Sequence, residues 1–273
     1  FITLVDDFEN EYEVVDNLGD QLLIKTNENA PTWKLVLVDP QNPQSDNWKV
    51  IIPEKEQVLQ SVSLVGGRIV AEYMKNASSV AYIYDYEGNY IEELQLPGIG
   101  SLSGIRGKKD EDLAFYSFTS FTFPSAVYKY NISTNTSEVY TRSEIDFDVD
   151  NYETKQVFYK SKDGTEISMF IVHKKGLKLN GKNPAYLYGY GGFNVSLTPS
   201  FSITRLVLLE NGFVYAMPNL RGGGEYGEDW HDAGIKLHKQ NVFDDFIAAA
   251  DYLINEGYTR PEKLAIAGGS NGG

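Results

Sequence analysis

The spacing of hydrophobic and polar residues divides the chain into two parts. In the first 145 residues, short runs rich in β-branched and aromatic residues are separated by turn sequences such as Glu87-Gly88-Asn89. This pattern predicts β-strands, among them residues 68–74, 79–85 and 90–96, with almost no helical periodicity.

Two strand patterns recur at a fixed interval in this first part. Leu37-Val38-Asp39 is followed after 46 residues by Ile83-Tyr84-Asp85, and after another 46 by Lys129-Tyr130-Asn131. The strand before it recurs at residues 22–24, 68–70 and 112–114. A four-stranded unit of this length is typical of a propeller blade. We expect residues 1–145 to be the C-terminal blades of a β-propeller whose other blades precede Phe1, with a meandering β-sandwich as the alternative.

The pattern changes after an acidic stretch at residues 145–150, which we interpret as a linker. A hairpin turned at Asp163-Gly164 is predicted first, and strands and helices alternate after it. The predicted hairpin strands are 157–161 and 166–173, the later strands are 185–188, 213–217 and 264–267, and the helices are 201–210 and 241–256. This alternation predicts a mostly parallel sheet with crossover helices.

Composition excludes several classes of function. With 42% hydrophobic residues the chain can bury a core, and no apolar run is long enough to span a membrane. A formal net charge of −14 disfavours nucleic acid as a partner. The absence of cysteine excludes disulfides and thiolate chemistry. No cluster of metal ligands stands out, so we predict neither a metal nor an organic cofactor.

The sequence Gly268-Gly269-Ser270-Asn271-Gly272 follows directly on the predicted strand 264–267 and fits the G-x-S-x-G pattern of a nucleophile elbow. In such a turn the serine has a strained backbone, and a Cβ two residues before or after it would clash. A phosphate-binding turn is the structural alternative, but its Lys-Ser/Thr ending is missing. Ser270 is therefore predicted to be a nucleophile.

Four ordered segments carry a family resemblance. Residues 184–193, 219–227 (followed by Trp230-His231), 239–246 and 268–273 resemble the catalytic domain of prolyl oligopeptidases, and they span nearly all of residues 150–273. The resemblance implies a seven-bladed propeller that caps an α/β-hydrolase domain. Residues 146–273 are then the first part of that domain, ending at the nucleophile elbow.

The resemblance also implies roles for individual residues. Ser270 attacks the peptide carbonyl, the Tyr190 hydroxyl and the Asn271 backbone N–H form the oxyanion hole, and Phe193 lines an apolar pocket for proline. The implied activity is that of a serine endopeptidase, which cleaves short peptides after proline through an acyl-enzyme. The resemblance further favours the cytoplasm, with the periplasm as the alternative, and we expect a monomer.

A serine nucleophile needs a base, which in α/β-hydrolases follows it in the order Ser, Asp or Glu, His. All three histidines, His173, His231 and His238, precede Ser270. We therefore expect the triad acid and base beyond Gly273, and we expect the 273-residue chain alone to be inactive.

Other polar residues near the motifs receive structural interpretations. Asp244 and Asp245 are assigned to the first turn of a helix capped by Asn241, where carboxylates complement the helix dipole. Arg221 and Glu225 are expected to pair with each other and to order their loop.

Two alternatives to a prolyl endopeptidase stay open at this point. One is a related hydrolase of the same architecture, either an acylaminoacyl-peptidase or an oligopeptidase for basic residues. The other is a non-catalytic propeller protein that binds partners through its blades.

Overall fold

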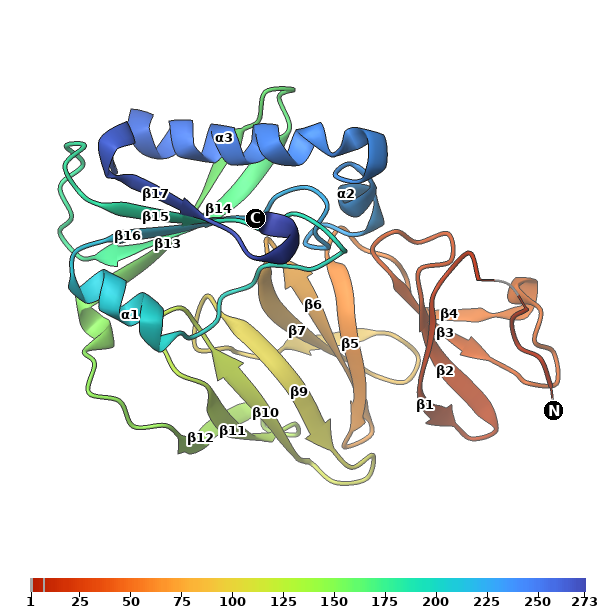
Figure 1. Cartoon of the computed structure of the whole chain (residues 1–273). Helices are drawn as coiled ribbons and strands as arrows, with labels where there is room; N and C mark the ends of the chain where they lie inside the picture. Colours follow the sequence, from red (N-terminus) through yellow and green to blue (C-terminus); the bar gives the residue numbers. More distant parts are fainter. Residues whose placement is uncertain (1, 7) are drawn as a thin grey trace.

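The computed structural model describes residues 2–6 and 8–273, which contain four β-sheets (Figure 1). The first three sheets have four antiparallel strands each, and in each sheet neighbouring strands follow one another in sequence. Their strands are β1 (Tyr12–Leu18), β2 (Gln21–Thr26), β3 (Lys34–Val38) and β4 (Lys49–Ile52); β5 (Val58–Val65), β6 (Arg68–Lys75), β7 (Ser78–Tyr84) and β8 (Tyr90–Glu93); and β9 (Ser101–Gly107), β10 (Leu113–Thr119), β11 (Ala126–Asn131) and β12 (Thr136–Arg142).

The 46-residue repeat of the sequence corresponds to these sheets. The repeated triplets at residues 37–39, 83–85 and 129–131 lie at the ends of β3, β7 and β11, the third strand of each sheet. The second strands, β2, β6 and β10, carry the other recurring pattern. The prediction of blade-like four-stranded units is therefore confirmed.

The three blades pack against one another through two apolar layers. The layer between the first and second blades contains Leu23, Leu35, Ile69, Tyr73 and Tyr84, and the layer between the second and third contains Val70, Ile83, Tyr116, Phe118 and Tyr130. All ten side chains are buried. Alternate residues of a strand point to opposite faces of a sheet, so the middle blade contributes to both layers.

The fourth sheet has five strands in the order β13-β14-β16-β15-β17. Its strands are β13 (Tyr152–Lys160), β14 (Glu166–Lys174), β15 (Ala185–Tyr188), β16 (Val214–Pro218) and β17 (Leu264–Ala267). Only the pairings β15–β16 and β15–β17 are parallel, because the β13–β14 hairpin joins the sheet antiparallel to β16. The strands β13, β16, β15 and β17 therefore run in one direction and only β14 runs against them, so the expectation of a mostly parallel sheet is confirmed for the described strands.

Helices cover both faces of this sheet (Figure 1). The helices are α1 (Ile203–Glu210), α2 (Glu228–Asp232) and α3 (Gln240–Asn255), with short 3-10 turns η1 (Ser45–Asn47), η2 (Val149–Asn151), η3 (Lys236–His238), η4 (Pro261–Lys263) and η5 (Ser270–Gly272). Ala249 and Leu253 of α3 pack against the face that bears Met169 of β14. Leu206 and Leu209 of α1 pack against the opposite face.

The third blade shares a core with the five-stranded sheet. Phe121, in the loop after β10, is fully buried, and its ring centroid lies 5.3 Å from that of Phe170 and 6.0 Å from that of Tyr215. The Arg205 guanidinium lies 4.4 Å from the centroid of the Tyr215 ring. An aromatic contact of this kind holds the blades and the sheet in a fixed relation.

Candidate active site

Ser270 lies where β17 ends and the short turn η5 begins. Its φ angle is 51°, in the left-handed region that non-glycine residues rarely adopt. A Cβ on Gly268 would overlap the carbonyl oxygen of Gly272, and a Cβ on Gly272 would lie 2.5 Å from the carbonyl oxygen of Gly189. The strained turn and the need for glycine on both sides of it are therefore as the elbow pattern predicts.

The loop after β15 lies directly against this elbow. The Asn271 side-chain Nδ2 donates hydrogen bonds to the carbonyl oxygens of Tyr190, at 2.9 Å, and Gly191, at 3.1 Å. The Gly189 N–H donates to the carbonyl oxygen of Ala267, at 3.1 Å. Tyr190, Ser270 and Asn271 thus come together at the carboxyl ends of parallel strands, where open α/β sheets place their sites.

Phe193 lies further along the same loop and is not a core residue. Phe193 is 75% exposed, and both Phe193 and Asn194 have positive φ angles, of 53° and 56°. The Asn194 N–H donates to the carbonyl oxygen of Gly222, at 3.1 Å, so the loop is held against the segment that follows β16. An exposed phenylalanine on an anchored loop offers an apolar surface, but its role in substrate binding stays a prediction.

Arg221 and Glu225 do not pair, contrary to the sequence expectation. The buried Arg221 guanidinium instead donates to Asp245, with Nη2 2.6 Å from Oδ1 and Nε 3.0 Å from Oδ2. Its Nη1 also donates to Asp163. The Arg221 hydrogen bond holds the pKa of Asp163 down at about 2. Burial alone would lower the pKa of Arg221, but its bonds to Asp245 and Asp163 raise it.

The start of α3 also differs from the prediction. The helix begins at Gln240 with Lys239 at the N-cap, whereas the Asn241 side chain donates to the carbonyl oxygen of Ala233, at 2.9 Å. Asp244 is half-buried, accepts a hydrogen bond from Gln240 Nε2 at 2.9 Å and has its Oδ2 3.6 Å from Lys162 Nζ. Asp245 is fully buried and serves as the counter-ion of Arg221, so it does not act as a dipole-complementing surface residue.

Glu225 is fully buried and holds the loop that carries Phe193. Its Oε1 accepts a hydrogen bond from the Leu197 N–H at 2.7 Å, and among the described residues its buried Oε2 has no partner. Burial raises the pKa of Glu225 to about 7. The sequence predicted a loop-ordering role for Glu225 but not this partner, because Leu197 lies 28 residues away and contributes only its backbone.

The histidines have structural surroundings in the described part of the chain. His173 is buried, with Nδ1 2.8 Å from the carbonyl oxygen of Lys174. His231 Nδ1 lies 2.8 Å from the carbonyl oxygen of Gly222, and His238 is exposed in η3. That the general base lies beyond Gly273 stays a prediction.

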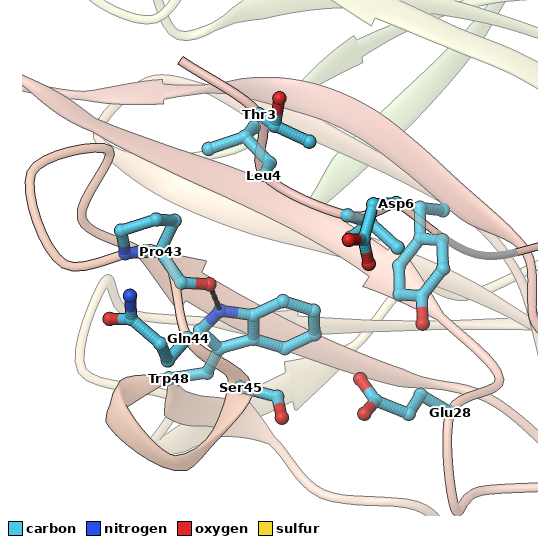
Figure 2. Close-up of a pocket in the computed structure, with 10 residues that line it drawn as sticks. Thr3, Leu4, Asp6, Glu28, Pro43, Gln44, Ser45 and Trp48 are labelled. Atoms are coloured by element: carbon cyan, nitrogen blue, oxygen red, sulfur yellow. Dashed lines mark hydrogen bonds between the residues drawn. The ribbon is translucent and has the colours of Figure 1, made fainter.

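A separate hollow of about 380 Å³ lies on the first blade (Figure 2). It is lined by Thr3, Leu4, Val5, Asp6, Tyr12, Glu28, Pro43, Gln44, Ser45 and Trp48. Trp48 Nε1 donates to the carbonyl oxygen of Pro43, at 2.8 Å (Figure 2). None of the predicted site residues lines this hollow.

Over residues 2–6 and 8–273, no group of three or more acidic, histidine or cysteine side chains is placed to hold a metal ion. No described helix is long and apolar enough to cross a membrane.

Comparison with known protein families accounts for both parts of the fold. The family model for the N-terminal β-propeller domain of prolyl oligopeptidase matches residues 1–143, which is more than half of the chain. The chain belongs to the prolyl oligopeptidase family. A second model, for the prolyl oligopeptidase family, matches residues 199–273. The resemblance seen in the sequence is therefore confirmed, as is a fold of propeller blades followed by the beginning of an α/β-hydrolase domain.

Relatives within the prolyl oligopeptidase family align with almost the whole chain. A prolyl endopeptidase of Elizabethkingia meningoseptica is 47% identical over 273 residues, and one of Dictyostelium discoideum is 40% identical over 285 aligned positions. The chain covers 39% of the first relative and 37% of the second.

Solved structures of the prolyl oligopeptidase family agree with the fold. One from a study of two prolyl endopeptidases has a TM-score of 0.93 at 47% identity, and the match covers 98% of this chain and 40% of the other. Prolyl oligopeptidase B of Galerina marginata, bound to a 25mer macrocyclization substrate, has a TM-score of 0.91 at 36% identity, with 98% and 38% covered.

We predict that Asp245→Ala lowers the free energy of unfolding by about 3–5 kcal/mol, because it leaves Arg221 as a buried charge without its main partner. The measurement is urea unfolding of the whole protein. Asp251→Ala, which removes an exposed aspartate from the same helix, is the control and should change the free energy of unfolding by about 0.5 kcal/mol or less. Equal losses for the two variants would contradict the assignment.

We predict that Glu225 makes stability fall as pH rises. The folded-state pKa of about 7 exceeds the usual value of 4.5, so the folded state retains a proton that the unfolded state releases between these values. Glu225→Gln removes this dependence. Relative to the wild type, the variant should gain about 2.5 kcal/mol between pH 5 and pH 8 in unfolding experiments. Exposed Glu256→Gln is the control, and a wild-type curve that parallels the Glu225→Gln curve would refute the prediction.

Proposed function

We propose that the whole protein is a serine endopeptidase that hydrolyses short peptides on the carboxyl side of proline. The observation that carries this proposal is the elbow itself. Ser270 has a left-handed backbone between two glycines that pack against the Tyr190 loop. Two relatives with this arrangement of segments are named prolyl endopeptidases. The proposal concerns the whole protein because the chain spans 39% of the length of these relatives.

In the proposed first step, Ser270 Oγ attacks the carbonyl carbon that follows the prolyl ring. The hydroxyl proton passes to a general base, which we expect beyond Gly273. Negative charge develops on the carbonyl oxygen, where the Tyr190 hydroxyl and the Asn271 N–H donate hydrogen bonds to it. The C–N bond then breaks, the proton goes to the leaving amine, and Ser270 holds the peptide as an ester.

In the second step, water attacks the ester and the acyl-enzyme is hydrolysed. The same base takes a proton from the water, and the same two donors stabilise the second oxyanion. The peptide leaves with a C-terminal proline carboxylate, and Ser270 regains its proton. None of these steps calls for a metal or an organic cofactor.

Phe193 is proposed to contact the proline ring of the substrate. Its side chain is exposed. The residue before it, Gly192, lies so close to the elbow that a Cβ there would overlap the Asn271 side chain, so the backbone of Phe193 is near the elbow as well. A largely apolar surface beside a few polar groups is typical of a specific ligand pocket.

Further features of the whole protein remain part of the proposal. We infer a division between propeller and catalytic domain at residues 145/146, a monomeric state, and a location in the cytoplasm. The propeller is proposed to limit access to short peptides. Gel filtration tests the monomeric state, and fractionation of the source cells tests the location in the cytoplasm.

Ser270→Ala should abolish both proline-specific hydrolysis and labelling by a fluorophosphonate probe, because only an activated serine attacks the probe. The experiment compares the folded whole protein with this variant. A labelled wild type and an unlabelled variant support the peptidase. An unlabelled wild type would favour a non-catalytic propeller protein, and a labelled wild type that prefers basic residues or blocked N-termini would favour one of the related hydrolases.

Tyr190→Phe should lower kcat by about 10²–10³-fold and change KM little, because the lost hydroxyl is proposed to act on the oxyanion of the transition state. Steady-state kinetics with a peptidyl-prolyl p-nitroanilide measure both constants. Tyr186→Phe, in the strand β15 that precedes the Tyr190 loop, is the control and should be close to wild type. A loss confined to KM would contradict the assigned role.

A further inference from the structure

Lys239 occupies an unexpected place at the start of α3. As the N-cap residue it lies at the positive end of the helix dipole, where a cation is unfavourable and Ser, Thr, Asp or Asn is preferred. Burial lowers the pKa of its ammonium group. Within the described part of the chain it forms no ion pair that would offset these costs. The polar contacts of Lys239 are instead directed at the candidate active site.

The Lys239 ammonium group bridges two segments of that site. Its Nζ donates to the carbonyl oxygen of Gly191, at 2.7 Å, and to the side-chain Oδ1 of Asn271, at 3.2 Å. Gly191 follows Tyr190 in the loop after β15, and Asn271 follows Ser270 in the elbow. One cation therefore links the segments that carry both proposed oxyanion donors and the nucleophile.

Lys239 also fixes the orientation of the Asn271 amide. An ammonium group can only donate, so it requires the amide oxygen on its side. The Nδ2 of Asn271 is then directed to the carbonyl oxygens of Tyr190 and Gly191, at 2.9 and 3.1 Å. A flipped amide would bring its oxygen against those two carbonyls and repel them. The Lys239 ammonium group, the Asn271 amide and the carbonyl oxygens of Tyr190 and Gly191 form one hydrogen-bonded unit, which we name the Lys239 clamp.

We propose that Lys239 is a positioning residue for the oxyanion hole: through the Lys239 clamp it holds the Tyr190 loop and Asn271 in register with Ser270. This inference rests on the proposed function. Oxyanion stabilisation depends on donors that are already in place when charge develops, so a loop that moves by a fraction of an ångström loses rate and leaves ground-state binding intact.

The test replaces Lys239 in the whole protein by Met, which keeps the length of the side chain and removes its donors. Lys239→Met should lower kcat for a peptidyl-prolyl p-nitroanilide by about 10- to 100-fold, with KM nearly unchanged. Lys239→Arg, which restores the charge and the donors, should recover most of the loss. Exposed Lys236→Met is the matched control three residues earlier and should behave as wild type.

Two inhibitors distinguish positioning from a merely structural role. A peptide aldehyde that ends in prolinal adds to Ser270 and places an oxyanion in the hole, whereas a peptide that ends in a proline carboxylate binds without that addition. Lys239→Met should weaken binding of the aldehyde by the same factor as it lowers kcat/KM, and it should leave binding of the carboxylate peptide unchanged. In a Tyr190→Phe background, the effect of Lys239→Met should shrink to a few-fold at most.

The outcomes separate this inference from the function on which it rests. Suppose that the wild type is active. The role of Lys239 alone would be overturned if Lys239→Met left kcat and the affinity for the aldehyde unchanged, or if it weakened binding of the aldehyde and of the carboxylate peptide equally. A folded wild type that neither cleaves nor is labelled at Ser270 would overturn the proposed function and this role with it. If Lys239→Met does not fold, Lys239→Gln, which keeps donors but cannot bridge both acceptors, is subject to the same criteria.

Discussion

The constraint on which the site depends is that the loops after β15, β16 and β17 touch backbone to backbone. A Cβ on Gly272 would lie 2.5 Å from the carbonyl oxygen of Gly189, and one on Gly222 would lie 2.9 Å from that of Gly191. Only hydrogen fits at these positions, so the glycines allow three strand ends to converge. Convergence brings a strained serine, a tyrosine loop and an amide side chain within reach of one another, which no single segment achieves.

Helix α3 stabilises that convergence from one side. Asp245 binds the Arg221 guanidinium and accepts from the Arg221 N–H, at 3.1 Å, which fixes the loop after β16. Six residues earlier, Lys239 reaches the loop after β15 and the elbow. Buried charges are costly unless all their partners are in place, so such contacts favour one arrangement of the loops over looser alternatives. The same helix packs its apolar face on the sheet, which makes it rigid enough for this purpose.

The sequence predicted the parts of this structure that depend on local pattern. Strand periodicity, the repeated triplets and the G-x-S-x-G turn each reflect residues close in the chain, and each was found as expected. The pairing of Arg221 with Glu225 was wrong because nearness in sequence does not specify which way a side chain points. The true partner, Asp245, is 24 residues away, and the Lys239–Asn271 contact spans 32. The antiparallel joining of β14 to β16 is likewise a long-range choice without a local signal.

The loop that carries Phe193 combines exposure with restraint. Two hydrogen bonds anchor the loop just after Phe193. The Asn194 N–H donates to the carbonyl oxygen of Gly222, and the Leu197 N–H donates to the Glu225 carboxylate. Both anchors are backbone donors, so they fix the path of the loop while leaving Phe193 75% exposed. An apolar side chain held in this way loses little further conformational entropy when a ligand covers it, which is the advantage of a preorganised surface. The buried Glu225 carboxyl is the cost of that arrangement, since it is desolvated to accept hydrogen bonds from the Leu197 N–H and the Asn219 side chain.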